Sequence, residues 1–310
     1  RIRRTGPMNV VGRSLLAVTN RSAVRTIFAE SSAGRRLSLR FVAGETLDEA
    51  AATALELNQA GARVSLDHLG EHVTDAAAAS EARDDYLRCL GRIREDNLDA
   101  NISVKLTQLG LGVDDELALE SLEQLADRAA AGGATVTIDM EESELVEKTV
   151  TAFEMVQARH GNVGIAVQSY LYRTPFDLDR IVARGGHVRL CKGAYAEPVE
   201  VAYQSTGRVD GAFDSLTTRL MAAPGIMPAI ATHDTERIEL TKRLSERRTE
   251  PWEFQMLYGV RTALQRSLID NGYPLRVYVP YGTAWYPYLT RRMAERPANL
   301  AFFLRAAFGR

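Results

Sequence analysis

The 310-residue sequence lacks several features that would each point to a particular class of protein. It has only two cysteines, Cys89 and Cys191, too few for a disulfide framework, which favours a reducing, cytoplasmic setting. The longest apolar runs fall far short of the ~18 residues that a membrane span needs, and no signal-peptide pattern is visible. The formal net charge is only -2, so nothing argues for a nucleic-acid partner.

Phosphate-binding glycine motifs are missing as well. Neither GxGxxG nor GxxxxGK[ST] occurs, whereas a doubly wound dinucleotide-binding fold predicts such a fingerprint after its first strand. The chain instead has an ordinary apolar content of 45%, enough for one large core or two domains. No Pro/Gly-rich linker divides it, which favours a single domain.

Short apolar or β-branched runs alternate with helix-forming segments along most of the chain. Eight runs are candidate strands: Arg63–Asp67, Ile102–Leu106, Thr135–Met140, Val163–Gln168, His187–Cys191, Pro228–Thr232, Phe254–Leu257 and Arg276–Val279. Helical windows are Thr46–Gln59, Thr74–Arg94, Asp115–Ala131, Glu142–Ala158, Pro175–Ala183, Thr235–Arg247 and Val260–Asp270. Pro280 removes a ladder donor and is expected to end the last strand. Eight strand–helix units within about 250 residues are typical of a (β/α)8 barrel.

Polar side chains stand at or near the C-terminal end of nearly every candidate strand. A strand buried on both faces should be almost purely apolar, and barrel enzymes carry their active sites at the C-terminal strand ends. A single such residue is commonly a satisfied buried group, but a whole ring would need many desolvated partners. We therefore interpret the following residues as a binding site: Lys105, Asp139, Gln168, Arg189, Lys192, Thr232, His233, Gln255 and Tyr278.

A final helix, expected from about Ala284, carries an unusual charged face. Residues spaced three, four or seven apart share one side of a helix, and here they are Tyr288, Arg291, Arg292 and Glu295. Two adjacent guanidiniums suit a small carboxylate, although a solvated face with an Arg291–Glu295 ion pair is the plain alternative. Lys192 is followed by two small residues, Gly193 and Ala194, whose backbone can approach a phosphate or a ring.

Several motifs together resemble the proline dehydrogenase family of flavoenzymes. They are KLTQLG, IDMEES, RLCKGAY, ATHD, EFQMLYGVR, YVPYGTAWYPYLTRRMAE and ANLAFFLR, and the similarity spans Phe41 to Arg305. The chain is similar to the short, single-function bacterial form. The resemblance implies a distorted (β/α)8 TIM barrel over residues 37–310, preceded by a helical segment over 1–36, with the final helix over the barrel mouth. It also implies non-covalent FAD and oxidation of L-proline to Δ1-pyrroline-5-carboxylate by hydride transfer to flavin N5.

The resemblance further implies roles for individual residues. Substrate contacts are expected from Lys105, Asp139, Leu257, Tyr278, Tyr288, Arg291, Arg292 and Glu295. Flavin contacts are expected from Met140, Gln168, Arg189, Lys192, Gly193, Ala194, Thr232, His233 and Gln255. Asp139 and Arg189 take the catalytic roles, and Lys105 is expected to hydrogen-bond to Asp139. Glu71 would form a gate with a helix arginine. Asp234 departs from the asparagine that relatives often have.

Partners follow from the same resemblance. Electrons are expected to pass to a membrane quinone, with peripheral membrane contact, and the product to a separate pyrroline-5-carboxylate dehydrogenase. No metal is expected.

Four alternatives remain open. His68–His72 spells the inverted zincin motif HxxEH, which requires one continuous helix, and Gly70 interrupts it. Cys191 could be a nucleophile, but no base is placed for it. The barrel could oxidise another cyclic amino acid, such as hydroxyproline, or be a non-catalytic binding protein.

Overall fold

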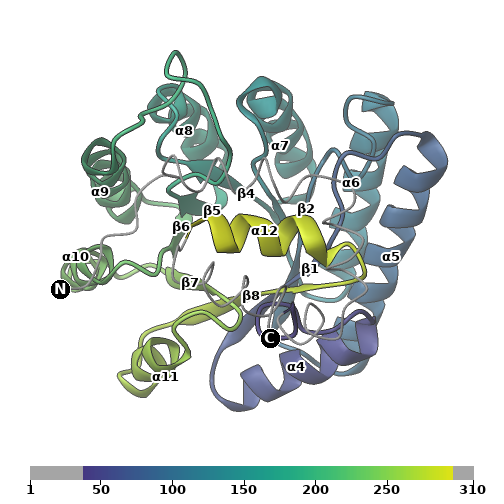
Figure 1. Cartoon of the computed structure of the whole chain (residues 1–310), viewed down its shortest axis with the longest axis horizontal. Coiled ribbons are helices and arrows are strands. Elements are labelled where there is room, and N and C mark those ends of the chain that lie inside the picture. Colours follow the sequence, from purple (N-terminus) through teal and green to yellow (C-terminus); the bar gives the residue numbers. More distant parts are fainter. Residues whose placement is uncertain (1–37, 296–310) are drawn as a thin grey trace, which may run out of the picture.

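The computed structural model describes residues 38–295, with side chains as far as Thr290, and shows a closed barrel of eight parallel strands (Figure 1). The strands are β1 (Arg63–His68), β2 (Ala100–Val104), β3 (Val136–Ile138), β4 (Val163–Gln168), β5 (Gly186–Cys191), β6 (Ile226–Ala231), β7 (Glu253–Leu257) and β8 (Leu275–Tyr281). Each pairs with the next in sequence, and β8 closes the barrel against β1. The predicted (β/α)8 barrel and the order of its strands are confirmed.

Helices surround the barrel on the outside (Figure 1). They are α4 (Leu47–Gln59), α5 (Ala76–Glu95), α6 (Asp115–Ala131), α7 (Val146–His160), α8 (Thr174–Arg184), α9 (Thr206–Ala222), α10 (Thr235–Ser245) and α11 (Thr262–Asp270). A further helix, α12 (Trp285–Glu295), lies over the barrel mouth. A short 3-10 turn, Ser143–Leu145, precedes α7. The start of α4 shows why the local sequence is helical: Thr46 accepts a hydrogen bond from the Glu49 amide, and the Glu49 carboxylate accepts one from the Thr46 amide at 3.0 Å.

The expectation that Pro280 ends the last strand is wrong. β8 continues through Pro280 to Tyr281, paired in register with β1. On the other side, the pairing of β7 with β8 stops at Leu257 and Tyr278. Pro280 therefore lies where β8 has a neighbour on one side only, a position that tolerates a missing donor. Its carbonyl accepts a hydrogen bond from the Ala43 amide at 2.9 Å.

Two apolar clusters hold the fold together. The larger fills the space between strands and helices. The smaller lies at the barrel mouth and consists of Phe41, Val42, Leu69, Trp285, Tyr286, Tyr288 and Leu289. It joins the segment before α4 to α12, which Figure 1 draws across the middle of the ring of strands. The predicted C-terminal helix over the mouth is confirmed.

The segment before α4 approaches the barrel closely at Gly259. This glycine has φ +70°, and a Cβ there would lie 1.6 Å from the carbonyl oxygen of Arg40. Only glycine allows the two backbones to meet in this way. As a result, Arg40 and Phe41 lie at the mouth although they precede the first strand.

Between Ser38 and Glu295, no helix has both the length and the apolar content to cross a membrane. The predicted helical segment over 1–36 lies outside the described residues.

Candidate active site

A cavity of about 360 Å³ opens at the C-terminal ends of the strands. Such a position is where barrel enzymes carry out their chemistry. The structure brings most of the predicted site residues to its wall: Lys105, Asp139, Met140, Gln168, Arg189, Lys192, Gly193, Ala194, Thr232, His233, Gln255, Leu257, Tyr278 and Tyr288. The predicted convergence of polar strand ends is therefore present, while the individual binding roles stay predictions.

Asp139, directly after β3, is the centre of the polar cluster in this wall. Its carboxylate accepts hydrogen bonds from the Tyr278 hydroxyl at 2.7 Å and the Ser103 hydroxyl at 2.8 Å. The Arg189 guanidinium also bonds to it. Burial opposes ionisation of Asp139, but the charges of Arg189 and Lys105 and these hydrogen bonds outweigh it, so its pKa lies below the ordinary value. Asp139 is thus an ionised acceptor at neutral pH.

Lys105 bonds to a residue that the sequence reasoning missed. Its Nζ lies 3.0 Å from Asp67 Oδ1 but 3.7 Å from Asp139 Oδ2. The expected hydrogen bond between Lys105 and Asp139 is therefore wrong, since the contact is a longer ion pair. Asp67 is fully buried and lines the cavity, and within residues 38–295 its Oδ2 has no hydrogen-bond partner. It closes a candidate strand, so the strand-end rule could have found it.

Arg189, in β5, is held from several directions. Its Nε donates to Gln255 Oε1 at 2.5 Å, and its terminal nitrogens donate to Ser103 Oγ at 2.9 Å and Ser65 Oγ at 3.3 Å. Its guanidinium also lies 5.2 Å from the centre of the Tyr278 ring. Burial works against the charge, but Asp139 outweighs it and raises the pKa of Arg189. The wall therefore presents a fixed cation.

The neighbouring part of the cavity wall, at the ends of β4 and β5, has a side-chain amide and two small residues. Gln168, at the end of β4, donates to the carbonyl of Glu141 at 2.8 Å and accepts from the Ala194 amide at 3.2 Å. Gly193 has φ +131°, and a Cβ there would lie 2.4 Å from the Tyr170 ring. The Tyr170 ring therefore requires a glycine at 193, and Gly193 and Ala194 line the cavity with little side-chain bulk.

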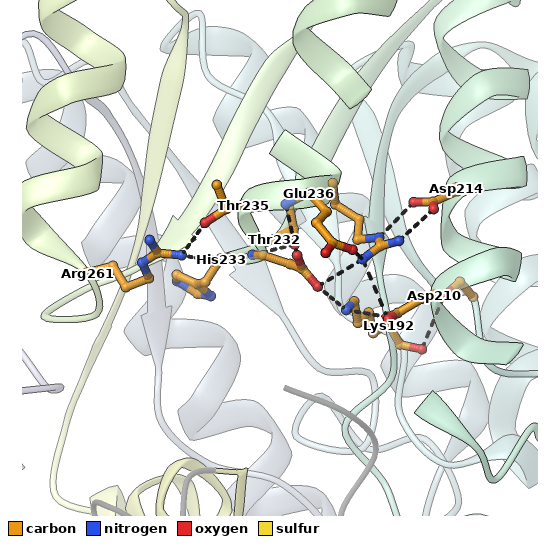
Figure 2. Close-up of polar contacts among 11 residues, drawn as sticks. Lys192, Asp210, Asp214, Thr232, His233, Thr235, Glu236 and Arg261 are labelled. Carbon is orange, nitrogen blue, oxygen red and sulfur yellow. Dashed lines mark hydrogen bonds and ion pairs between the residues drawn. The ribbon is translucent and has the colours of Figure 1, made fainter. Parts of the chain in front are cut away.

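The outer rim of the cavity is a network of ion pairs (Figure 2). Lys192 Nζ lies 2.5 Å from Asp210 and 2.9 Å from Asp234. Arg237 lies beside them and donates hydrogen bonds from two of its nitrogens to Asp214, at 2.9 and 2.8 Å. Asp234, the departure from the family pattern, thus has a definite role in holding Lys192.

His233 and Arg261 form the neighbouring part of the rim (Figure 2). His233 Nε2 accepts a hydrogen bond from the Leu257 amide at 3.0 Å, and because that amide can only donate, the ring proton is on Nδ1. Arg261 donates to the His233 carbonyl at 2.5 Å. Thr232 accepts from the Asp234 amide at 3.0 Å. These contacts fix the loop that follows β6.

The remaining predicted site residues are placed as follows. Tyr288 is buried and lines the cavity from α12. The helix continues to Glu295, but the side chains of Arg291, Arg292 and Glu295 lie outside the described part of the chain. Glu71 lies in the loop after β1 and is not part of the cavity wall. The carboxylate clamp and the gate stay predictions.

The inverted zincin motif is excluded by the fold. His68 ends β1 and packs against the rings of Tyr86 and Tyr281, with centres 6.1 and 5.1 Å away. His72 lies in the following loop, so no helix joins the two histidines as the motif requires.

Fold and site together define a (β/α)8-barrel enzyme with a cavity of mixed charge at its mouth. A family model described as proline dehydrogenase matches residues 50–305. The chain belongs to the proline dehydrogenase family, whose members are flavin-dependent oxidoreductases.

Similar proteins cover nearly the whole chain. Proline dehydrogenase 1 of Bacillus subtilis subsp. natto is 38% identical over 283 residues, which cover 90% of this chain and 93% of that protein. The proline dehydrogenase of Deinococcus radiodurans is 35% identical over 277 residues, covering 87% and 89%. The structure of proline utilization A from Bdellovibrio bacteriovorus has a TM-score of 0.78 at 22% identity, covering 84% of this chain and 32% of that one. This last likeness shows the fold alone.

Proposed function

We propose that the protein oxidises L-proline to Δ1-pyrroline-5-carboxylate with FAD as its cofactor. The reaction removes a hydride from C5 and a proton from the nitrogen. The observation that carries the proposal is the buried cluster of Asp139, Arg189 and Tyr278 in the wall of a cavity that Gln168, Gly193 and Ala194 also line.

The cavity residues fit a flavin. The edge of an isoalloxazine alternates hydrogen-bond donors and acceptors, which side-chain amides such as Gln168 and a guanidinium such as Arg189 can match. Gly193 and Ala194 line the cavity with little side-chain bulk, which suits a flat ring, and Lys192 and Arg261 supply cations for a diphosphate. FAD, when bound, supplies the two-electron acceptor. Since Lys192 is paired with two carboxylates in this structure, a diphosphate must compete with them.

The chain's own residues would orient the substrate. Tyr278, Tyr288 and Leu257 offer ring and apolar surfaces for the pyrrolidine. Arg291 and Arg292 would bind its carboxylate through paired charged hydrogen bonds. Ionised Asp139 would accept a hydrogen bond from the substrate nitrogen and stabilise the positive charge that develops there as the hydride leaves. Glu71 would close the site by pairing with a helix arginine.

The same proposal extends to partners. The electrons would pass to a quinone, which requires the protein to touch a membrane peripherally, and the product would be taken up by a separate pyrroline-5-carboxylate dehydrogenase.

The decisive test is the visible spectrum of the purified protein before and after anaerobic addition of L-proline. A flavin band near 450 nm (approximately, as flavins absorb) should bleach with L-proline, and a parallel titration with hydroxyproline measures the preference between the two. A folded preparation that takes up no FAD, or a flavin that no cyclic amino acid reduces, would refute the proposal.

The carboxylate clamp has its own test. Arg292→Met should raise the KM for proline about 100-fold with flavin retained, because each of two charged hydrogen bonds contributes about 1.5 kcal/mol and about 1.4 kcal/mol corresponds to a factor of ten. Arg243→Met, on an exposed position of α10, is the matched control and should leave KM unchanged. An unchanged KM in Arg292→Met would remove this residue from the site.

A further inference from the structure

A buried carboxylate lies inside the barrel below the cavity and plays no part in the proposed reaction. Glu253 is the first residue of β7 and is 1% exposed. It accepts hydrogen bonds from Arg276 Nε in β8 at 2.7 Å and from Gln255 Nε2 at 2.7 Å. Arg63 approaches it from the barrel rim at 3.5 Å. A charge at such a position is costly unless it is well paired, so its contacts call for an explanation.

Glu253 determines which way the Gln255 amide points. The two residues are two apart in β7, so their side chains share the inner face of the barrel. A carboxylate can only accept, so it binds the NH2 end of the Gln255 amide. The oxygen end is then turned toward Arg189 Nε, which can only donate, at 2.5 Å. In the opposite orientation, an NH2 group would face a guanidinium and an oxygen would face a carboxylate.

The carboxylate stays ionised in this position. Burial favours the neutral acid, but the Arg276 charge and the hydrogen bonds from Arg276 and Gln255 outweigh it and lower the pKa of Glu253. A protonated Glu253 could donate and would then compete with Arg189 Nε for the oxygen of the Gln255 amide. An ionised one cannot.

The Gln255 amide in turn holds one edge of Arg189. Asp139, Ser103 and Ser65 bind the terminal nitrogens of the guanidinium, whereas its Nε donates to Gln255. Because the terminal contacts alone leave the planar group free to tilt, the Nε contact fixes its plane against the cavity.

We propose that Glu253 is a positioning residue of the active site: by orienting the Gln255 amide, it holds the Arg189 guanidinium in the plane that faces the cavity. This inference rests on the proposed function, because Arg189 acts there beside the bound flavin.

Glu253→Gln is the test. Glutamine at 253 is neutral and can turn either an oxygen or an NH2 group toward Gln255, so it holds the NH2 end of that amide less firmly than a carboxylate does. The acceptor for Arg189 Nε is then less well fixed. The turnover number should fall about tenfold with little change in the KM for proline, the size of one hydrogen bond to a charged group. Once displaced, the Arg189 guanidinium stabilises the reduced flavin less. A tenfold loss in its preference for the reduced over the oxidised flavin lowers the two-electron midpoint potential of the flavin by about 30 mV.

Two companion variants separate positioning from general structural damage. In Glu253→Gln/Gln255→Glu, a carboxylate at 255 faces Arg189 and accepts from the amide at 253, with the net charge unchanged. It should return the Arg189 guanidinium to its wild-type plane in a crystal structure, which a loss of the Arg276 contact alone could not do. Thr137→Val removes contacts to Asn101 and His187, at 3.0 and 2.5 Å, from the same barrel interior. It leaves Gln255 untouched and should not change the potential.

The outcomes distinguish this inference from the proposed function. If the wild-type flavin bleaches with proline and Glu253→Gln has the wild-type potential and turnover number, the inference is overturned and the proposed function stands. If the wild-type flavin does not bleach, the proposed function fails, and a crystal structure of Glu253→Gln decides the positioning role. A rotated Gln255 amide with a shifted Arg189 supports it, and unchanged side chains overturn it. Should Glu253→Gln not fold, the crystal structure of the double variant decides in the same way.

Discussion

Replacing Lys105 with methionine tests whether one ammonium holds the buried carboxylates at the barrel mouth. Lys105 is 6% exposed and its partner Asp67 is fully buried. Asp139 keeps its bonds to Arg189 and Tyr278 after the substitution. Asp67 keeps only the Tyr86 hydroxyl, at 3.5 Å, as a hydrogen-bond donor within the described residues. Nearly the whole effect therefore falls on Asp67.

The expected loss follows from what an unpaired buried charge costs. Removing one partner of a buried ion pair lowers stability by about 3–5 kcal/mol, and removing both partners is often close to neutral. Because Tyr86 remains, we expect Lys105→Met to lose about 3 kcal/mol, or about 6 °C in Tm at about 2 °C per kcal/mol for a domain of this size. Lys105→Met/Asp67→Asn should recover at least about 2 kcal/mol of that loss.

Urea unfolding followed by circular dichroism at pH 8 provides the measurement, at equal flavin content because bound ligand adds stability. Lys148→Met is the matched control, since Lys148 pairs with Asp115 on the exposed surface and should contribute at most about 1 kcal/mol. A loss below about 1 kcal/mol in Lys105→Met, or a double variant as unstable as the single one, would refute the reasoning.

Three further predictions concern stability. Thr46→Ala removes the side-chain cap of α4 and should lower the free energy of unfolding by about 1 kcal/mol in urea, with turnover unchanged. Burial lowers the pKa of His187 from 6.5 to about 3, so between these pH values the unfolded chain binds a proton that the folded protein does not bind. Stability should therefore fall as pH drops from 6.5 toward 3, by at most about 1.4 kcal/mol per pH unit from this group, and His187→Gln should lose that part of a pH series. Gly193→Ala places a methyl against the Tyr170 ring at a φ of +131°, so the flavin-free protein should lose more than about 1 kcal/mol in thermal unfolding; equal stability would contradict this.

The strands and their order could be predicted because each barrel strand is a short apolar or β-branched run between turn residues. The site could be located for the same reason: a ring of polar residues at the ends of such runs, among them Lys105 and Gln168, has few structural explanations. The capping box at Thr46 could also be predicted from the sequence, since it depends on residues only three apart.

The contacts between side chains could not be predicted, because they depend on register and on distances across the barrel. Lys105 has carboxylates on both sides, and only the geometry, 3.0 Å against 3.7 Å, shows that Asp67 is the closer partner. Glu253 in β7 accepts a hydrogen bond from Arg276 in the neighbouring strand β8, and the sequence does not specify the register of these two strands. Pro280 continues a strand because its neighbour β7 has already ended, which is again a property of the assembled barrel.

The contact between Gly259 and the carbonyl of Arg40 has a consequence for protein engineering. Arg40 and Phe41 help to enclose the cavity, and Phe41 shares an apolar cluster with Trp285 and Leu289 of α12. A shortened chain that starts at α4 would keep every strand yet lose part of the chamber wall and an anchor of the final helix. A chimera that is to keep the cavity must therefore include the segment before α4. A chimera joined at the first strand should fold, but it should bind small molecules in the cavity weakly.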